Sequence, residues 1–244
     1  MTRQLGFLAG LAALVLLWSL AARETLPAVL PGPLAVLEAL CSLFADTGFW
    51  RDAFLPSLAR AAAGLALALA AGVPLGLLAW RWGLVSAFLG PLRLLLMGIP
   101  APILAILCIL WFDGGTVTVV LTVSVLLLPV FQIAVAEGMS AIDPELAEMA
   151  RVFQVPLLPR LRQIILPAVW TAFGPALRVA TANALRVTLL TELLSGAEGL
   201  GAAVQRAQSW LQTDRLFALV VVILLLIGLA ETLLSLLVNK RHQL

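Results

Sequence analysis

Six long apolar windows constrain the fold of this chain more than any other feature of its sequence. They lie at about Leu5–Ala22, Leu58–Trp80, Ser86–Trp111, Thr116–Ala136, Pro167–Leu190 and Leu216–Val238. A helix needs roughly 20 mostly apolar residues to cross a bilayer. Only 11% of the 244 residues are charged, against about 25% in soluble domains, so the chain cannot cover itself with a polar surface. We therefore expect an all-α membrane protein with six transmembrane helices, built as one domain over residues 1–244.

The first window has a second interpretation. Arg3, the apolar run and the triplet Ser19-Leu20-Ala21 also resemble a cleaved signal peptide, whose removal would leave five spans. With six spans, the arginine and lysine residues at the span ends favour a cytoplasmic location for both termini. The eight on the inside are then Arg3, Arg81, Arg93, Arg151, Arg160, Arg162, Lys240 and Arg241, and the five on the outside are Arg23, Arg51, Arg60, Arg206 and Arg215.

The composition excludes several classes of function. There is no basic run, so we expect no nucleic-acid partner. The only histidine, His242, lies in the C-terminal tail, which argues against a metal site or a Ser-His-Asp triad within the membrane. The only lysine, Lys240, is followed by Arg241, so the chain has no G-x-x-x-x-G-K-[ST] phosphate loop. If ATP drives this protein, another subunit must hydrolyse it.

Two windows carry signals for their packing. In the second window Gly64, Ala68, Gly72 and Gly76 recur every four residues, which predicts that another helix approaches closely on that face. The third window contains Pro100 and Pro102, and each proline removes an intrahelical hydrogen bond and can kink the span.

A helix is predicted to begin in the polar loop between the fourth and fifth windows. Asp143 is a good N-cap, Pro144 suits the first helical position and Glu145 suits the first turn. Pro156 and Pro159 are expected to stop this helix, and a second helix is expected near Arg160. An apolar stripe follows the spacing i, i+3, i+4 and i+7 through Leu146, Met149, Ala150 and Phe153.

The same loop resembles the EAA loop of ABC-importer permeases, in which E-A-A, three residues, G, nine residues and I-x-L-P follow one another. The matching residues are Glu148, Ala150, Ile164, Leu166 and Pro167, while Met149 replaces the second A. Gln154 stands where the family has glycine. Because glutamine adopts a positive φ less readily than glycine, we expect the turn to shift to the Val155–Pro156 bond.

Two further stretches resemble the nitrate, taurine and sulfonate permeases of this group. Pro100 and the run Leu110-Trp111-Phe112 match the third-span motif, although Ile106 occupies the place of its second proline. The stretch LRVATANALRVTLLTELLSGAEGLG, residues 177–201, resembles the fifth span of these permeases, which also tend to place an arginine at Arg178 and a glutamate at Glu192.

The fifth window also carries charge at an unusual depth. Arg178 lies 11 residues after Pro167, which places it about 16 Å into the bilayer, near the midplane. An arginine at that depth needs water or a partner. One interpretation is a salt bridge to Glu137 or Glu231 that serves packing alone. The other is a translocation path lined by a stripe within about 80° of the helix circumference, formed by Arg178, Thr181, Thr188 and Glu192 and interrupted by Leu185.

The resemblance implies a type I ABC-importer permease in a bacterial inner membrane. Such a permease would pair as a homodimer with two ATPase subunits, which bind ATP and Mg, and with a periplasmic solute-binding protein. It is not itself an enzyme and needs no cofactor. The loop at about residues 141–166 would couple it to the ATPase through Glu148, Ala150, Phe153, Gln154, Pro156, Ile164, Leu166 and Pro167.

The substrate is less constrained than the class. Arg178 favours a small anion such as a sulfonate, taurine or nitrate, and a vitamin precursor or other heterocycle is the second candidate. From another class, a secondary transporter would have no use for the loop motif, and many such transporters carry an internal repeat that this sequence lacks. A membrane enzyme is disfavoured because the spans contain few His, Asp or Lys residues.

Overall fold

The computed structural model describes the backbone of residues 2–240, and the side chains of that range except those of residues 2–4, 7, 8, 11 and 237–240. Within this range the chain forms helices and no strand, as the all-α prediction requires. The elements are α1 (Thr2–Glu24), α2 (Pro33–Ala45), α3 (Leu55–Arg81), α4 (Gly83–Gly98), α5 (Ala101–Phe112), α6 (Gly115–Ser140), α7 (Pro144–Val152), α8 (Leu157–Arg160), α9 (Leu166–Ser195), α10 (Leu200–Ser209) and α11 (Thr213–Lys240), with π-helical turns at Phe49–Phe54 and Leu161–Ile165.

Most of the predicted spans are long apolar helices in the structure. Four helices in the described part are long and apolar enough to cross a membrane: Phe49–Arg81, Gly115–Ser140, Leu157–Ser195 and Thr213–Leu236. The bent pair α4 and α5 makes a fifth if it counts as one span. The first predicted window falls on α1, which includes several residues whose side chains lie outside the description.

The third window is not one continuous span. It forms α4 and α5, whose axes are bent by 103°. The break falls at Ile99 and Pro100, both of which are extended, with ψ of 123° and 136°. Proline has no N–H and disfavours helical backbone in the residue before it, so Pro100 ends α4 at Gly98. Pro102 then sits in the first turn of α5, where proline is tolerated, and Ile106 lies in the unbroken part of α5.

The centre of the molecule is α6, which packs between α3 and α9 and is the most buried of the spans. The small residues of α3 face it, as predicted. A Cβ atom added at Gly76 would lie 2.6 Å from the carbonyl oxygen of Gln132, and one added at Gly64 would lie 2.6 Å from Cβ of Val123. Since side chains do not tolerate such distances, glycine is what allows the two helix backbones to approach this closely.

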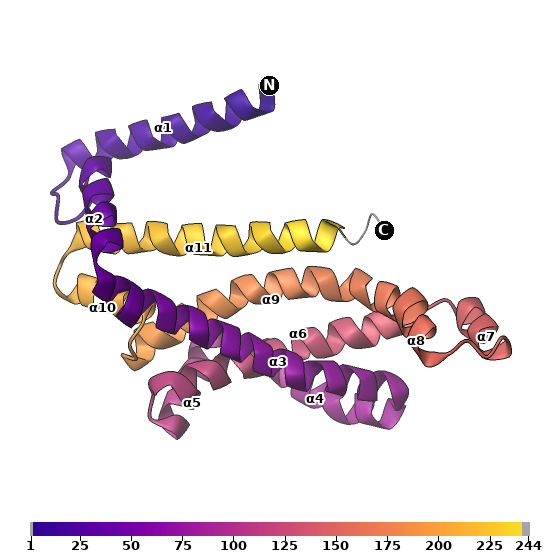
Figure 1. Ribbon diagram of the computed structural model, residues 1–244. Helices are drawn as coiled ribbons and strands as arrows, with labels where there is room; N and C mark the ends of the chain where they lie inside the picture. Colours follow the sequence, from indigo (N-terminus) through magenta and orange to yellow (C-terminus); the bar gives the residue numbers. More distant parts are fainter. Residues whose placement is uncertain (1, 241–244) are drawn as a thin grey trace.

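The two ends of the molecule are built differently. Figure 1 shows α7 at one end, and α2 and α10 at the opposite end. The α10 end has its own apolar cluster, in which Val36, Ala39 and Leu43 of α2 pack with residues of α10 and α11. Trp18 of α1 stacks on Phe217 of α11 at a centroid distance of 6.1 Å. These contacts attach α1 at this end, and Figure 1 shows the rest of α1 running apart from the bundle.

Candidate functional site

The coupling loop, residues 141–166, begins with a capped helix. The Asp143 side chain accepts a hydrogen bond from the backbone N–H of Glu145 at 2.9 Å, and Pro144 occupies the first helical position. These are the predicted roles of both residues. The carboxylate at the N-terminus of α7 also interacts favourably with the helix dipole.

The turn after α7 is made by Gln154 itself. Its φ is +50°, so the prediction that the turn would shift to the Val155–Pro156 bond was wrong. The N–H of Val155 donates to the carbonyl of Ala150 at 2.9 Å, and the N–H of Gln154 donates to that of Arg151 at 3.1 Å. This pair of bonds is a Schellman motif, which normally uses glycine. The two hydrogen bonds offset the left-handed backbone of Gln154, which costs about 1–2 kcal/mol.

The second part of the loop leads directly into the fifth span. Helix α8 begins at Leu157 and not near Arg160 as predicted, because Pro159 lies in its first turn, where a missing N–H costs nothing. The π-helical turn Leu161–Ile165 then continues into α9. Pro167 follows at the start of α9. Because proline has no N–H to donate, the α-helical hydrogen-bond pattern is interrupted there, which agrees with the π-helical turn just before it. The helix is thus continuous from Leu157 to Ser195, whereas α7 is joined to it by the turn at residues 153–156.

The coupling loop exposes apolar side chains at the end of the molecule. Ala150 is 2% exposed and faces the protein, whereas Phe153 is 74% and Leu157 is 77% exposed. Glu148 is exposed and forms no ion pair within the described side chains. Figure 1 shows α7 beyond the ends of α6 and α9, so these residues do not lie among the spans. Exposed apolar patches are typical of surfaces that contact another protein or a membrane.

The remaining loop residues of the motif occupy different positions. Ile164 is half-buried and lines a cavity of about 210 Å³ together with Trp80 and Arg160. Leu166 and Pro167 are exposed on the first turn of α9. The motif therefore combines an exposed face around Phe153 with residues that fix the loop to the ends of the spans.

The four predicted path residues do not share one environment. Arg178 is exposed and Thr181 is half-buried, while Thr188 and Glu192 are fully buried in the protein. The hydroxyl of Thr181 donates to the carbonyl of Leu177 at 2.9 Å. The stripe thus runs from the surface of the protein into its interior along α9.

The salt bridges proposed for Arg178 are not formed among the described side chains. Glu231 lies 3.5 Å from Arg186 instead, and no ion pair joins Arg178 to Glu137. Arg186 also donates to the Asn183 side chain at 3.2 Å.

A groove between α6 and α9 contains polar residues that the sequence analysis did not assign. One cavity, of about 350 Å³, is lined by Asn183, Arg186 and apolar residues of α5 and α6. A second, of about 390 Å³, is lined by Glu137 and Thr171, and Val130 lines both. The signal available in the sequence was the Asn-x-x-Arg spacing of 183 and 186, which places both side chains on one helix face.

A buried ionic network holds α3, α9 and α10 together. Arg60 Nη1 lies 2.9 Å from Glu192 Oε1, and Ser57 Oγ donates to Glu192 Oε2 at 2.6 Å. The Glu192 side chain has no exposed surface and that of Arg60 has 10%. Arg60 also donates through Nε to Thr116 Oγ1 at 3.0 Å, and through Nη1 to the carbonyl of Glu198. Both charges are therefore paired and hydrogen-bonded, as buried charges must be.

Glu192 also replaces the missing cap of α10. The N-cap residue, Gly199, has no side chain to offer. The N–H of Gly201 donates to Glu192 Oε2 at 3.1 Å, and the N–H of Leu200 donates to Ser57 Oγ at 2.8 Å. A side chain at Gly199 would collide with the Glu192 carboxylate, and φ at Gly199 is +140°. This arrangement favours a structural role for Glu192 over exposure to a path.

Nothing in these sites is arranged as a metal centre. Within the described residues no three His, Cys, Asp or Glu side chains lie close enough together to hold an ion. The sites offer an exposed apolar surface on the loop at residues 141–166, a polar groove along α9 and a buried ion pair near α10.

Comparison with known proteins places the chain in a family. Residues 64–243 match the family described as "Binding-protein-dependent transport system inner membrane component". The permease protein SsuC of Bacillus subtilis (strain 168), named for aliphatic sulfonates transport, is 27% identical over 185 residues, which are 75% of this chain and 67% of SsuC. The taurine transport system permease protein TauC of Escherichia coli (strain K12) is 26% identical over 235 residues, covering 94% of this chain and 85% of TauC.

Solved structures show the same fold. A chain of the MetNI methionine ABC transporter in an inward-facing conformation superposes with a TM-score of 0.63 at 17% sequence identity, covering 80% of this chain and 98% of that one. The chain thus has the fold of type I ABC-importer permeases. The chain is a multi-pass membrane protein that belongs to the family of binding-protein-dependent transport system inner membrane components.

Proposed function

We propose that this chain is the transmembrane permease subunit of an ATP-driven importer and that its coupling loop contacts the ATPase. The observation that carries this proposal is the exposed apolar surface around Phe153 and Leu157, on a capped helix beyond the spans. ATP and Mg would be bound by the partner chain, because this sequence has no phosphate loop.

The proposed assembly contains two copies of the permease, two ATPase subunits and a periplasmic solute-binding protein. Membership in a binding-protein-dependent transport family supports the last partner. Under this proposal the coupling loop lies in the cytoplasm, as do both termini. ATP binding would move the loop, and α9 would follow because α8 and Leu161–Ile165 continue into it as one helix. The spans would then alternate between access to the two sides of the membrane.

We propose that the path runs along the groove between α6 and α9, with Arg178 at its flank. Arg178 lies seven residues after Thr171, a lining residue of the groove, and so lies within about 20° of it around the helix. Asn183 and Arg186 continue the polar surface of the groove further along α9. This proposal keeps Arg178 beside the path, and assigns Thr188 and Glu192, which are buried, to the supporting interior.

A small organic anion is the substrate class that fits this path best. Two arginines on one span provide cationic donors for a sulfonate or a carboxylate, and sulfonates and taurine are named for the relatives SsuC and TauC. These relatives and the charge of the span support the same class of substrate.

Co-purification tests the central contact. Phe153→Asp places a charge in the exposed apolar patch, and the ATPase subunit should no longer co-purify with the full-length permease in detergent. Leu26→Asp is the matched control, because Leu26 is 72% exposed in the segment between α1 and α2, at the opposite end of the molecule. The control should retain the ATPase. Retention of the ATPase by Phe153→Asp, or failure of the unmodified permease to bring down an ATPase, would contradict the proposal.

A further inference from the structure

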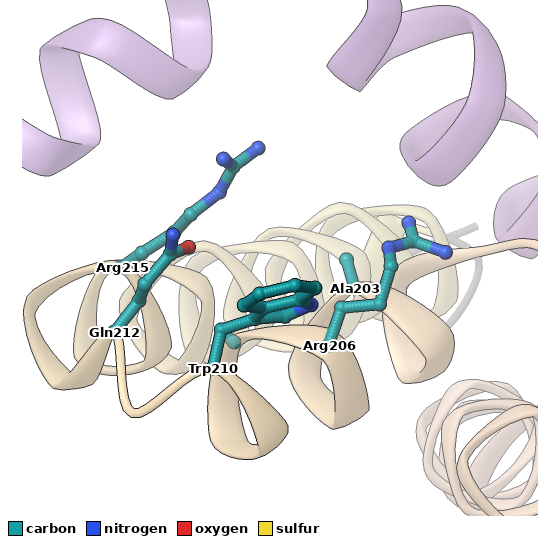
Figure 2. Close-up of a pocket in the computed structure, with 6 residues that line it drawn as sticks. Ala203, Arg206, Trp210, Gln212 and Arg215 are labelled. Carbon is teal, nitrogen blue, oxygen red and sulfur yellow. The ribbon is translucent and has the colours of Figure 1, made fainter.

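The end of the molecule opposite the coupling loop contains a cationic cavity that the proposed transport function does not use. It has a volume of about 230 Å³ and lies on α10, α11 and the turn between them. Figure 2 shows Arg206, Trp210, Gln212 and Arg215 projecting from the same side of this segment, with the indole between the two guanidinium groups in this view. The lining is completed by the small side chains of Ala203 and Ala207.

Each polar side chain that lines this cavity can donate a hydrogen bond to an anion. Two guanidinium groups, the Gln212 amide and the Trp210 indole N–H line it, and no acidic residue does. Within the described side chains neither Arg206 nor Arg215 takes part in a hydrogen bond or an ion pair. Two unpaired arginines around one cavity favour an anionic ligand, and guanidinium groups suit phosphate oxygens in particular.

The cavity lies at the end of the span α11, where the membrane surface is expected. Helix α11, which is long and apolar enough to span a membrane, begins at Thr213, so Arg215 lies in its first turn and Trp210 lies just before it. Tryptophan and arginine at such a position lie at the level of the lipid headgroups. The cavity is therefore within reach of the phosphates of the leaflet opposite the coupling loop.

Leu211 adds an independent observation at the same turn. Its φ is +52°, and the N–H groups of Leu211 and Gln212 close the C-terminus of α10 on the carbonyls of Gln208 and Ala207. Glycine would adopt this backbone at lower cost. The leucine side chain is nevertheless present and is 75% exposed, beside Trp210 at 76%. Since it packs on little of this chain, its apolar surface is free to contact lipid.

We propose that Arg206, Trp210, Gln212 and Arg215 bind the phosphate of an anionic phospholipid, while Leu211 lies in the adjoining apolar layer. An anionic lipid is favoured over a zwitterionic one because the two arginines have no acid beside them in the cavity. This inference rests on where the spans lie in the membrane, and it does not depend on which substrate is transported.

Native mass spectrometry of the full-length protein in detergent tests the proposal, with phosphatidylglycerol and phosphatidylcholine as the added lipids. The unmodified protein should retain phosphatidylglycerol in preference to phosphatidylcholine. The double variant R206Q/R215Q should retain about tenfold less phosphatidylglycerol, because it keeps donors but loses both charges. The matched control R23Q/R51Q removes two charges from exposed residues of the segments before α3, outside the cavity, and should retain phosphatidylglycerol like the unmodified protein.

Four results would overturn the proposal. The first is lipid retention by R206Q/R215Q equal to that of the unmodified protein. The second is an equal loss of lipid in the control, which would indicate general attraction to charge. Glycerol phosphate displacing the lipid at similar concentration would indicate a site for free anions. Equal retention of both lipids would show that the arginines do not select a charged headgroup. Gel filtration of each variant establishes that it is folded before retention is compared.

Discussion

At the scale of single residues, the most consequential feature is the burial of Glu192 with Arg60. A buried ion pair contributes little net stability compared with apolar residues of the same size, but removing one partner leaves the other charge stranded. Here the stranded group would also lose the hydrogen bonds to Ser57 and to the N-terminus of α10. The pair is therefore expected to be intolerant of single substitutions.

The substitution Glu192→Ala should lower the free energy of unfolding by about 3–5 kcal/mol, because Arg60 would remain buried without its counter-charge. Thermal unfolding in detergent measures this. Glu198→Ala is the matched control, since the side chain of Glu198 is exposed and only its backbone carbonyl enters the network. If both substitutions lower the unfolding temperature equally, the network does not stabilise the fold as described.

Arg178 is expected to behave in the opposite way. Arg178→Gln should lower uptake about tenfold, the loss expected for one charge-assisted hydrogen bond to the substrate. Stability and basal ATP hydrolysis should remain nearly unchanged, because Arg178 is exposed and forms no ion pair among the described side chains. Uptake and thermal unfolding are measured on the same preparation, with Arg51→Gln as the control. A destabilised variant that still transports would remove Arg178 from the path.

At the scale of helices, the sequence predicted those features that depend on nearby residues. Asp143 and Pro144 locate the start of α7, and the small residues of α3 identify the face that packs on α6. Each of these signals acts within one or two helical turns. The prolines of the third window predicted a kink, but the size of the bend, 103° between α4 and α5, could not be predicted because Pro100 within an apolar run is compatible with a kink or with a complete break of the helix.

Other features were beyond local reasoning. The turn at Gln154 depends on two backbone hydrogen bonds. The preference of glutamine for one backbone conformation or another does not predict how strongly these two bonds favour the turn. The partners of Glu192 are Ser57 and Arg60, more than 130 residues away in the chain, and no spacing rule relates them. The groove residues Asn183 and Arg186 were visible as polar residues, but which face of α9 is covered depends on tertiary packing.

The close contact of α3 and α6 gives a prediction at this scale. Gly76→Ala should destabilise the protein by about 1–3 kcal/mol, because the added methyl group would lie 2.6 Å from the Gln132 carbonyl oxygen. Gly90→Ala is the matched control. It lies inside α4 with no atom within 4 Å of the added Cβ, and alanine favours helix. The unfolding temperature should therefore fall for Gly76→Ala, and it should rise or stay the same for Gly90→Ala. Equal stability of both would contradict the close packing.

At the scale of the whole molecule, three regions with different features follow one another along its length. One end presents the coupling loop, the middle contains the spans with the α6–α9 groove, and the other end holds the ionic network and the cationic cavity (Figure 1). Because α9 runs from the loop to the network, motion imposed at α7 would be transmitted to both other regions. This continuity is what an alternating-access importer requires of its permease.

The coupling role of the loop is tested most directly by measuring ATP hydrolysis and uptake together. The measurement uses proteoliposomes that contain the complete transporter with Glu148→Arg. Glu148 is exposed on α7 within the coupling loop, and Glu24→Arg supplies the same change of charge at the end of α1. The account predicts that Glu148→Arg leaves the membrane fold intact and allows ATP hydrolysis to continue, while uptake per ATP falls far below that of the control. Normal uptake per ATP in Glu148→Arg would contradict the coupling role of the loop.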